Sequence, residues 1–471
     1  MIKKTKLVAA LVMAFAAQGV MASSVDFGGY LRSGSGTSSK GGDNVCFRVN
    51  GDSAFDPGGY AAVDGAGRLG NQCDTYGEIT LGLTMGESEG TKFGVHTLVA
   101  YGTQQVIDYE QTVPAFREAY GSAQGFGKGS LAKSTVWAGK RYYNRKDVHI
   151  VDLFTLEVAG PGAGIENIDF GFGKFSFALM KTGNANFANL AAPNVGGPPL
   201  TVTTVDGQQI ARATLVGDTG QQKSNYDFRL EGIDLGKAGS LGFGTNIIRS
   251  NNSDTVGNNY NGWSAWATHS IVMFGGVQNG LTLETAHDAG SLNGGGLWWA
   301  NSNSGNGSPD SMKHGGWRVI DAANFEFGDR WNGQAFLGYG KEHFPWFGIG
   351  SSANTDRTTS SLVVRPVYHF TENVSLAVEA GETLVRGYNL NYDGNPGATT
   401  NHLTKLTIAP QLSMGSGFYA RPVLRAYYSY AGWNKGGAHA CTGRDCQTAV
   451  PGTFANVQSA NTYGVQMEAW W

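Results

Sequence analysis

The chain has 471 residues with 34 basic and 37 acidic side chains, so its formal net charge is −3. A nucleic-acid-binding protein is expected to carry a basic face, and this balance argues against one. Glycine is unusually frequent, at 71 residues, which disfavours helices, while 41% apolar residues are too many for a disordered chain. With 11% aromatic residues as well, the composition favours a large all-β protein with many turns.

The N-terminus has the three-part pattern of a secretory signal peptide. Lysines between residues 3 and 6 are followed by an apolar run over 7–17, which is too short to span a bilayer. Small residues come next, and cleavage fits after Ala22, with cleavage after Ser24 as an alternative. A buried N-terminal helix would not require this order of basic, apolar and small residues, so we expect export.

We therefore expect residues 1–22 to be a signal peptide and residues 23–471 to form one barrel domain. Removing the signal removes three lysines, which leaves 31 basic against the 37 acidic residues and a net charge near −6. No later stretch has the apolar length of a membrane helix. The sequence shows no clear internal repeat and no domain boundary.

Cysteines supply a further clue, because an exported chain reaches an oxidising compartment in which disulfides persist. The four cysteines allow three pairings. Local pairing of Cys46 with Cys73 and of Cys441 with Cys446 is the simplest, since each bridge closes a loop between adjacent predicted strands. A zinc site is the alternative, but neither pair lies near a histidine pair with ligand spacing. We expect no metal and no other cofactor.

Alternating apolar and polar residues define about eighteen segments, each near the length that a tilted membrane strand needs. In chain order they lie at 25–33, 75–86, 91–104, 115–122, 134–142, 166–171, 174–182, 226–234, 239–249, 261–272, 280–288, 316–326, 331–341, 358–369, 373–385, 401–413, 417–431 and 461–471. One apolar side per strand suits a wall between lipid and a wet pore. The sequence therefore predicts an all-β fold, an 18-stranded antiparallel transmembrane β-barrel.

The connections between these segments alternate in length. Short ones lie at 86–90, 234–238, 328–330, 371–373 and 414–417, and long ones at 34–74, 143–165, 183–225, 289–315 and 432–460. Membrane barrels have short periplasmic turns and long outer loops, whereas a soluble sandwich has no reason to sort its loops in this way. An even strand number also lets the last strand pair with the first, which removes the sheet edges.

Successive strand residues point to opposite faces, so parity separates the lipid side from the lumen side. In the first segment Val25 and Phe27 share the apolar side, while Tyr30 and Arg32 share the polar side. The same rule assigns to the lipid side Ile79, Leu81, Leu83, Phe418, Leu424, Val465 and Trp471. It assigns to the lumen side Tyr76, Glu78, Tyr419, Arg421, Arg425, Gln466, Glu468 and Trp470.

Four of the lumen-side residues are aromatic and lie near charged ones, namely Tyr30, Tyr76, Tyr419 and Trp470. Most aromatics of a membrane barrel belong to girdles at the two interfaces, and Phe418 and Trp471 fit that position. A girdle does not explain rings inside a wet pore. A stacking surface does, because the C–H faces of a sugar ring can lie on an aromatic ring while neighbouring charges bind its hydroxyls. Packing against a loop folded into the pore is the alternative.

Several segments resemble the maltoporin family, the maltose- and maltodextrin-selective channels of Gram-negative outer membranes. They are 25–34, 68–76, 114–118, 137–143, 145–149, 160–164, 166–169 and 466–471. The resemblance is specific in the N-terminal third and at the C-terminus, whereas 183–400 matches only in layout. It implies an eighteen-stranded barrel in the outer membrane, a homotrimer, a third loop (here 143–165) folded into the pore, and a first-loop disulfide that matches Cys46 and Cys73.

The resemblance also implies roles for individual residues. A slide of aromatics for sugar stacking would consist of Tyr30, Tyr76, Tyr109, Tyr419 and Trp470, with Tyr109 where the family has a tryptophan contributed by a neighbouring subunit. A polar track at the constriction would consist of Arg32, Arg68, Glu78, Arg117, Arg145, Asp147, His149 and Asp152, with Phe154 in place of the usual tyrosine. Tyr109 and Tyr419 replace tryptophans, and a sixth slide aromatic, expected near 274–277, has no clear match.

Three functions remain open at this stage. The first is a channel for facilitated diffusion of maltose and maltodextrins, and the second is a porin for another oligosaccharide such as sucrose. The third is a secreted glycan-binding or glycan-hydrolysing protein, for which Asp147 and Asp152 could supply paired carboxylates. An enzyme has no need for a lipid-facing parity on nearly every strand, so we expect no catalytic residue and favour the first function.

Overall fold

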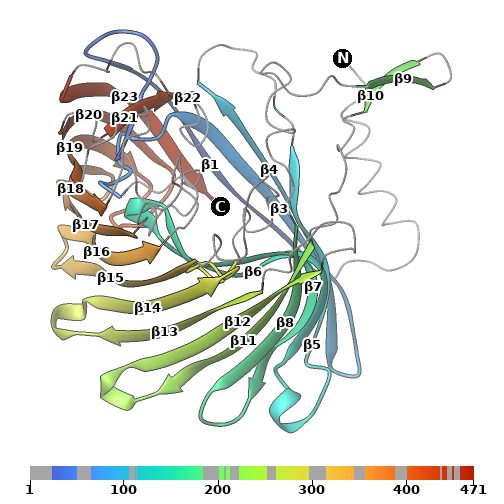
Figure 1. Cartoon of the computed structure of the whole chain (residues 1–471). Helices are drawn as coiled ribbons and strands as arrows, with labels where there is room; N and C mark the ends of the chain where they lie inside the picture. Colours follow the sequence, from blue (N-terminus) through green and yellow to red (C-terminus); the bar gives the residue numbers. More distant parts are fainter. Residues whose placement is uncertain are drawn as a thin grey trace.

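A computed structural model shows the chain as a closed antiparallel barrel whose main sheet contains 18 strands (Figure 1). The structure describes residues 24–49, 65–105, 112, 114–183, 201–205, 208–212, 222–251, 261–295, 314–343, 356–387, 400–434, 438–442, 448–449, 454 and 457–471. The predicted signal peptide, residues 1–22, lies outside this range. Among the described residues, no helix is long and apolar enough to cross a membrane.

The barrel wall follows the chain order of its strands. These are β1 (Ser24–Ser38), β3 (Asp74–Ser88), β4 (Thr91–Gln104), β5 (Ala115–Gln124), β6 (Thr135–Val148), β7 (Leu153–Asp169), β8 (Lys174–Gly183), β11 (Gln222–Asp234), β12 (Ser240–Asn251), β13 (Gly262–Val272), β14 (Gln278–Asp288), β15 (Gly315–Phe327), β16 (Trp331–His343), β17 (Asp356–His369), β18 (Val374–Gly387), β19 (Thr400–Ser413), β20 (Val423–Trp433) and β23 (Ser459–Trp470). Because β1 pairs with both β3 and β23, the last strand closes the sheet onto the first, as predicted.

Parity sorts the side chains of the wall as the sequence indicated. Val25, Phe27 and Trp471 are more than half exposed on the outer face, with relative exposures of 60%, 62% and 53%. Arg32 and Glu468, on the opposite parity, are buried in the lumen. The outer surface is thus apolar and the inner surface charged, which is the arrangement that a lipid-embedded barrel requires.

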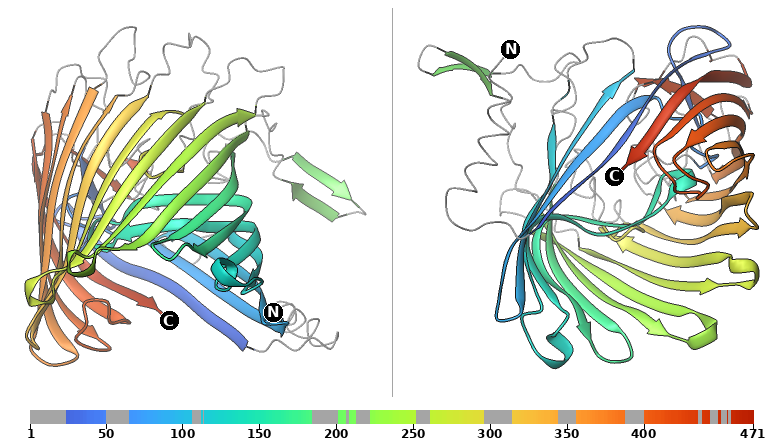
Figure 2. Two further views of the ribbon diagram at one scale, coloured as in Figure 1. Left: turned by 90° about the horizontal axis from the view of Figure 1, so that it is seen from below. Right: turned by 180° about the vertical axis from the view of Figure 1, so that it is seen from behind.

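The strands are joined at one end by short turns, some of which contain 3-10 helices, and β23 ends at this same end (Figure 2). The 3-10 helices η1 (Gly129–Leu131), η4 (Gly236–Ala238) and η5 (Phe274–Gly276) belong to these turns, and η2 (His149–Val151) joins β6 to β7. By the rule for outer-membrane barrels, the short-turn end is periplasmic.

Two outer loops meet in a small second sheet at the opposite end. It consists of β2 (Cys46–Val49), β21 (Ala438–Thr442) and β22 (Thr448–Ala449), and a separate hairpin consists of β9 (Thr201–Val205) and β10 (Gln208–Arg212). Phe47 packs its ring against Trp433 and Phe454, with centroids 5.2 and 5.8 Å apart. The first and last outer loops are thereby joined to each other and packed against wall strands β18 and β19.

The hairpin of β6 and β7 leaves the wall and folds into the lumen. β6 pairs with β5 only up to Lys140, and β7 pairs with β8 only from Gly162, so the residues between them pair with each other. Gly139 and Gly160, near the two points of departure, have φ of 134° and 143°, values that L side chains rarely adopt. A Cβ on either would also lie within 2.5 Å of a neighbouring backbone oxygen.

This hairpin confirms a segment folded into the pore but corrects its form. The alternation pattern predicts a connection over 143–165 and a strand over 166–171, whereas β7 already begins at Leu153. The alternation rule failed because neither side of an internal hairpin faces lipid, so no apolar side is imposed on it. The segment predicted as a strand over 417–431 is also displaced: β20 begins at Val423, and residues 414–422 form a turn.

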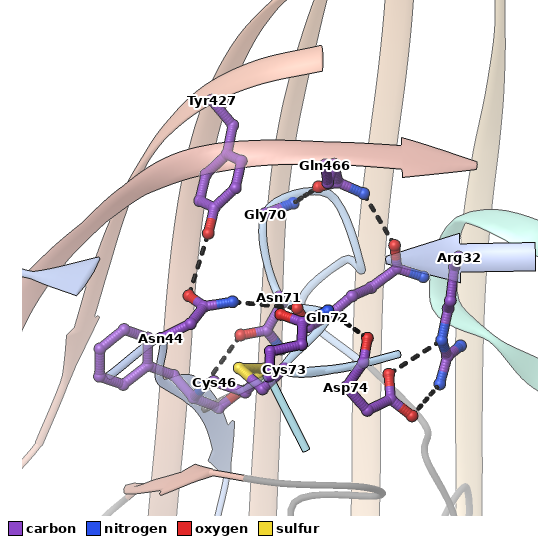
Figure 3. The surroundings of a disulfide bond; sticks show 12 residues. Arg32, Asn44, Cys46, Gly70, Asn71, Gln72, Cys73, Asp74, Tyr427 and Gln466 are labelled. Carbon is purple, nitrogen blue, oxygen red and sulfur yellow. Dashed lines mark hydrogen bonds and ion pairs between the residues drawn. A yellow bond between two sulfur atoms is a disulfide. The ribbon is translucent and has the colours of Figure 1, made fainter. Parts of the chain in front are cut away.

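The first outer loop also enters the lumen, held by a disulfide and by wall side chains (Figure 3). Cys46 and Cys73 form the predicted bridge. Beyond it, the Leu69 N–H donates to Glu379 of β18 at 2.8 Å, and Lys405 of β19 donates to the Leu69 carbonyl at 2.5 Å. Cys446 lies outside the described residues, so its pairing with Cys441 stays a prediction.

Candidate functional site

Four aromatic side chains from three wall strands and one inward turn lie in one continuous run in the lumen. The ring centroid of Tyr30 lies 6.1 Å from that of Tyr76 and 6.4 Å from that of Trp470, and Trp470 lies 6.5 Å from Tyr419. Tyr76 is on β3, Tyr30 on β1, Trp470 on β23, and Tyr419 on the turn after β19. Tyr419 remains 44% exposed, so part of its surface is open to solutes.

Arg68, on the inward first loop, joins this run to the hairpin tip. Its guanidinium donates to the Tyr30 hydroxyl at 3.0 Å and lies 3.2 Å from a Glu468 oxygen. Another nitrogen of the same group lies 3.1 Å from Nδ1 of His149, and the Arg68 backbone N–H donates to the Ile150 carbonyl at 2.9 Å. The first loop and the β6–β7 tip are therefore bonded directly to each other in the lumen.

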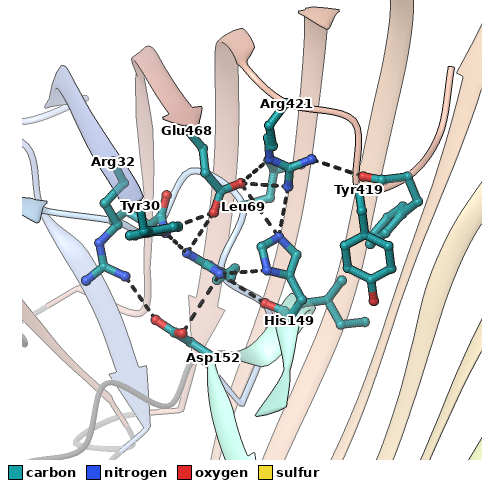
Figure 4. Close-up of polar contacts among 12 residues, drawn as sticks. Tyr30, Arg32, Leu69, His149, Asp152, Tyr419, Arg421 and Glu468 are labelled. Carbon is teal, nitrogen blue, oxygen red and sulfur yellow. Dashed lines mark hydrogen bonds and ion pairs between the residues drawn. The ribbon is translucent and has the colours of Figure 1, made fainter. Parts of the chain in front are cut away.

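Glu468 lies at the centre of the charged network beside the rings (Figure 4). It accepts hydrogen bonds from Tyr30 at 3.0 Å and from Arg421 at 2.7 Å, and it lies 3.4 Å from Arg425. The Arg421 guanidinium also covers the Trp470 ring, with 4.1 Å between its carbon and the ring centroid. A second carboxylate, Asp152, bonds Arg32 at 3.0 Å.

His149 and Asp152, at the hairpin tip, have shifted proton affinities. Burial lowers the pKa of His149 to about 4, and the nearby guanidinium groups act in the same direction, against the charge of Glu468. Burial alone would raise the pKa of Asp152, but the guanidinium groups of Arg68 and Arg32 outweigh it and hold that pKa below its usual range. At neutral pH the tip therefore carries a neutral imidazole and an ionised carboxylate.

A second group of residues lies where β3 and β5 face the hairpin. The Arg145 guanidinium lies between two rings, 3.9 Å from the Phe154 centroid and 4.4 Å from the Tyr142 centroid. Arg117 donates to the Tyr142 hydroxyl, and Arg145 also lies 3.9 Å from Glu78. The Tyr76 hydroxyl donates to Glu78 at 2.5 Å, which connects this group to the start of the aromatic run.

Most residues singled out from the sequence meet in these two groups, with three exceptions. Asp147 is exposed and forms no side-chain ion pair among the described residues, although its carboxylate lies close enough to Arg68, Arg145 and Asp152 to interact with them electrostatically. Tyr109 lies outside the described residues. Phe274, considered for a sixth slide aromatic, is fully exposed on the η5 turn, away from the lumen.

Phe418 corrects a lipid-side assignment. It was placed on the lipid side by parity, yet its ring packs among buried residues of the lumen and lies 5.0 Å from the ring of Tyr419. The residue belongs to the turn 414–422, which leaves the wall and folds inward, so strand parity does not apply to it. Phe418 therefore adds a ring to the periplasmic end of the aromatic run.

Other residues of the site were absent from the predicted set. Glu468 and Arg421 had been placed on the lumen side by parity, so the signal for their position was in the sequence, but nothing there showed that they meet. Tyr142 lies within a segment that carried the family resemblance. Among the described residues, no group of three or more His, Cys, Asp or Glu side chains could hold a metal ion.

A closed barrel with an apolar outer face and a lumen narrowed by two inward segments defines an outer-membrane porin, a channel for solutes. Comparison with known proteins identifies the family. Residues 25–471 match the family model described as LamB porin, and the chain belongs to this family. The protein is therefore an outer-membrane protein of a Gram-negative bacterium.

Three solved structures with a similar course of the chain are distant in sequence. OccAB1 of Acinetobacter baumannii is 8% identical with a TM-score of 0.47, and covers 96% of this chain and 99% of its own. OccAB2 of the same organism is 11% identical with a TM-score of 0.45 and covers 96% and 99%. OccD3 of Pseudomonas aeruginosa is 9% identical with a TM-score of 0.44 and covers 96% and 92%. Similarity at this level says nothing about the solute.

Proposed function

We propose that this porin conducts maltose and maltodextrins by facilitated diffusion along its aromatic run. The observation that supports this most is the unbroken sequence of Tyr76, Tyr30, Trp470 and Tyr419, with centroids 6.1 to 6.5 Å apart and charged groups beside each ring. A linear glucan presents an apolar C–H face and a hydroxyl rim on every unit. Similar platforms at similar spacing therefore receive each unit in turn.

Passage requires sites that a sugar enters easily and also leaves easily. As a glucose unit moves, its stacking contact with one ring is replaced by a stacking contact with the next ring. Charged groups replace the hydrogen bonds that the sugar hydroxyls made with water. The loss of one such charge-assisted bond costs about 1.5–3 kcal/mol. Because neighbouring sites offer similar contacts, the path stays nearly level and the concentration gradient alone drives transport.

The charged network has a positioning role in this proposal. Glu468 and Arg68 bind the Tyr30 hydroxyl from two sides, and Arg421 covers one face of Trp470. The rings are thereby held in register at the narrowest part of the lumen. Arg117, Arg145, Asp147 and Glu78 line the approach from the outer side, where we propose that they bind the hydroxyls of an entering sugar.

Phe154 distinguishes this channel from a maltoporin with a tyrosine at that place. Its ring lies against Arg145 at 3.9 Å and offers no hydroxyl to a sugar or to water. This position supports a second candidate, a porin that prefers another oligosaccharide such as sucrose. The two candidates differ in the solute that blocks the pore, not in the pore itself.

We also propose that the protein acts as a homotrimer after removal of residues 1–22. The β5–β6 ladder covers only 119–124 and 135–140, so the outer half of β5 has lost its neighbour to the inward hairpin. Phe116 in that half is 63% exposed. An unpaired strand edge with an exposed aromatic suits coverage by a neighbouring copy, from which Tyr109 would reach the slide.

The test is the conductance of the pure protein in a planar bilayer with maltooligosaccharides of increasing length. We expect block that strengthens from maltose to longer glucans, because more units stack at once. Block by sucrose or another sugar without block by any linear glucan would favour the second candidate. Conductance that no sugar affects would contradict both.

A further inference from the structure

A small cavity lies at the periplasmic end of the lumen, behind the inward turn 414–422. It is bounded by β16, β17, β19 and β20, and its polar lining includes Arg365, Arg421, Arg425, His369, Asn332 and Ser413.

The lining is cationic. Its three guanidinium groups depend on two carboxylates outside the lining: Arg365 lies 2.5 Å from Glu379, while Arg421 and Arg425 share Glu468 at 2.7 and 3.4 Å. Each carboxylate also serves a further cation, since Lys405 lies 3.2 Å from Glu379 and Arg68 lies 3.2 Å from Glu468. All three lining arginines are at least nine-tenths buried. Positive charge buried in excess is costly unless an anion compensates it.

His369 supplies a second, independent sign of a missing acceptor. It is 4% exposed, and its Nε2 faces the Asn332 amide nitrogen at 3.1 Å. An amide nitrogen is a donor only, so Nε2 must accept, and the neutral ring carries its proton on Nδ1. That Nδ1–H is buried and has no hydrogen-bond partner in the described structure. A buried donor of this kind needs an acceptor.

We propose that this cavity binds one small anion, of the chloride class, held by the guanidinium groups of Arg365 and Arg425 and by the Nδ1–H of His369. The cationic lining and the unpaired donor of His369 favour an anion over a water molecule. The bound ion stabilises the turn 414–422 and, through Arg421, the position of the Trp470 ring. The site lies beside the sugar path and does not depend on which sugar the channel conducts.

The direct test is bromide, which scatters X-rays anomalously and replaces chloride. Crystals of the full protein grown in bromide salts are expected to show one anomalous peak in the cavity, within contact distance of the guanidinium groups. The same crystals of Arg425→Gln are expected to lose the peak, and those of Arg330→Gln, which changes an exposed arginine on another turn, to keep it. A cavity that holds only water, with no anomalous peak, would overturn the proposal.

Thermal stability gives a readout that does not need crystals. The unfolding midpoint of the detergent-solubilised protein is expected to rise with bromide or chloride and reach a plateau, relative to gluconate at equal ionic strength. Arg330→Gln should keep this rise and Arg425→Gln should lose it. An identical halide response in wild type and Arg425→Gln would contradict the site even if both variants fold. If Arg425→Gln does not fold, an absent halide effect in wild type and Arg330→Gln is the contradicting result.

Discussion

Two clusters of aromatic rings and arginines lie inside this barrel, and they differ in exposure. In the slide cluster, Trp470 is partly exposed and Tyr419 is 44% exposed. In the anchor cluster, at the base of the inward hairpin, Trp137 and Tyr143 are 3% and 4% exposed. There the Arg229 guanidinium lies 4.2 Å from the Tyr143 ring and is itself buried. The two clusters have the same composition, yet only the first presents free ring faces to the lumen.

The comparison shows that exposure, not residue type, separates a binding surface from an anchor. Arginines in the anchor cluster fill the space between rings, and Arg141 and Arg229 both bond Glu166, so nothing is left for a solute. In the slide cluster the arginines bond Glu468 and leave ring faces open. We therefore expect substitutions in the anchor cluster to change stability and substitutions in the slide cluster to change sugar binding.

The largest expected effect is that of Trp137→Ala. Removing a fully buried tryptophan leaves a cavity under the hairpin, and we expect a loss of about 4–5 kcal/mol in unfolding free energy. Chemical unfolding of the detergent-solubilised protein measures it, with the outward Trp331→Ala as control. Equal stability of the two variants would show that the anchor cluster does not support the hairpin.

Glu468→Gln is expected to cost about 4 kcal/mol, because a neutral amide leaves Arg68, Arg421 and Arg425 buried without their shared carboxylate. The same unfolding measurement applies, and Glu87→Gln, at an exposed position of β3, is the control. A variant as stable as wild type would mean that other groups already balance these guanidinium charges.

Lowering the pH provides a milder change in the slide cluster. The folded pKa of His149, about 4, is below its ordinary value of 6.5, so the folded state takes up this proton later than the unfolded state does. Stability from this group is complete above pH 6.5 and is lost as the pH falls toward 4, by about 3 kcal/mol in total. The difference between wild type and His149→Gln over this window measures it. Parallel stability profiles would contradict the shifted pKa.

The wall of the barrel could be predicted from the sequence because lipid imposes a strict alternation on it. All eighteen predicted segments overlap wall strands, and the parity of Tyr30, Tyr76 and Trp470 placed them correctly in the lumen. Wherever the chain leaves the wall, that constraint ends. The hairpin of β6 and β7 was therefore predicted as a connection. Phe418 was predicted to face lipid, although it lies in a turn to which strand alternation does not apply.

The charged network of the site was only partly predictable, for a different reason. Arg68, His149 and Glu468 come from the first loop, the hairpin tip and the last strand, and they meet only because the barrel closes and both segments fold inward. The alternation of strand residues predicts that a side chain faces the lumen. The alternation does not predict which other lumen side chains that side chain contacts.

The proposal that sugars pass along the aromatic run is best tested on two adjacent residues, Trp470 and Trp471, which point to opposite faces of the wall. In planar bilayers, Trp470→Ala is expected to weaken block by a long maltooligosaccharide about tenfold, the equivalent of about 1.4 kcal/mol, with open conductance unchanged or raised. Trp471→Ala removes a ring from the lipid side, so the sugar should block this variant as strongly as it blocks the wild type. If every sugar tried blocked both variants and the wild type equally strongly, the result would contradict an aromatic path through this channel.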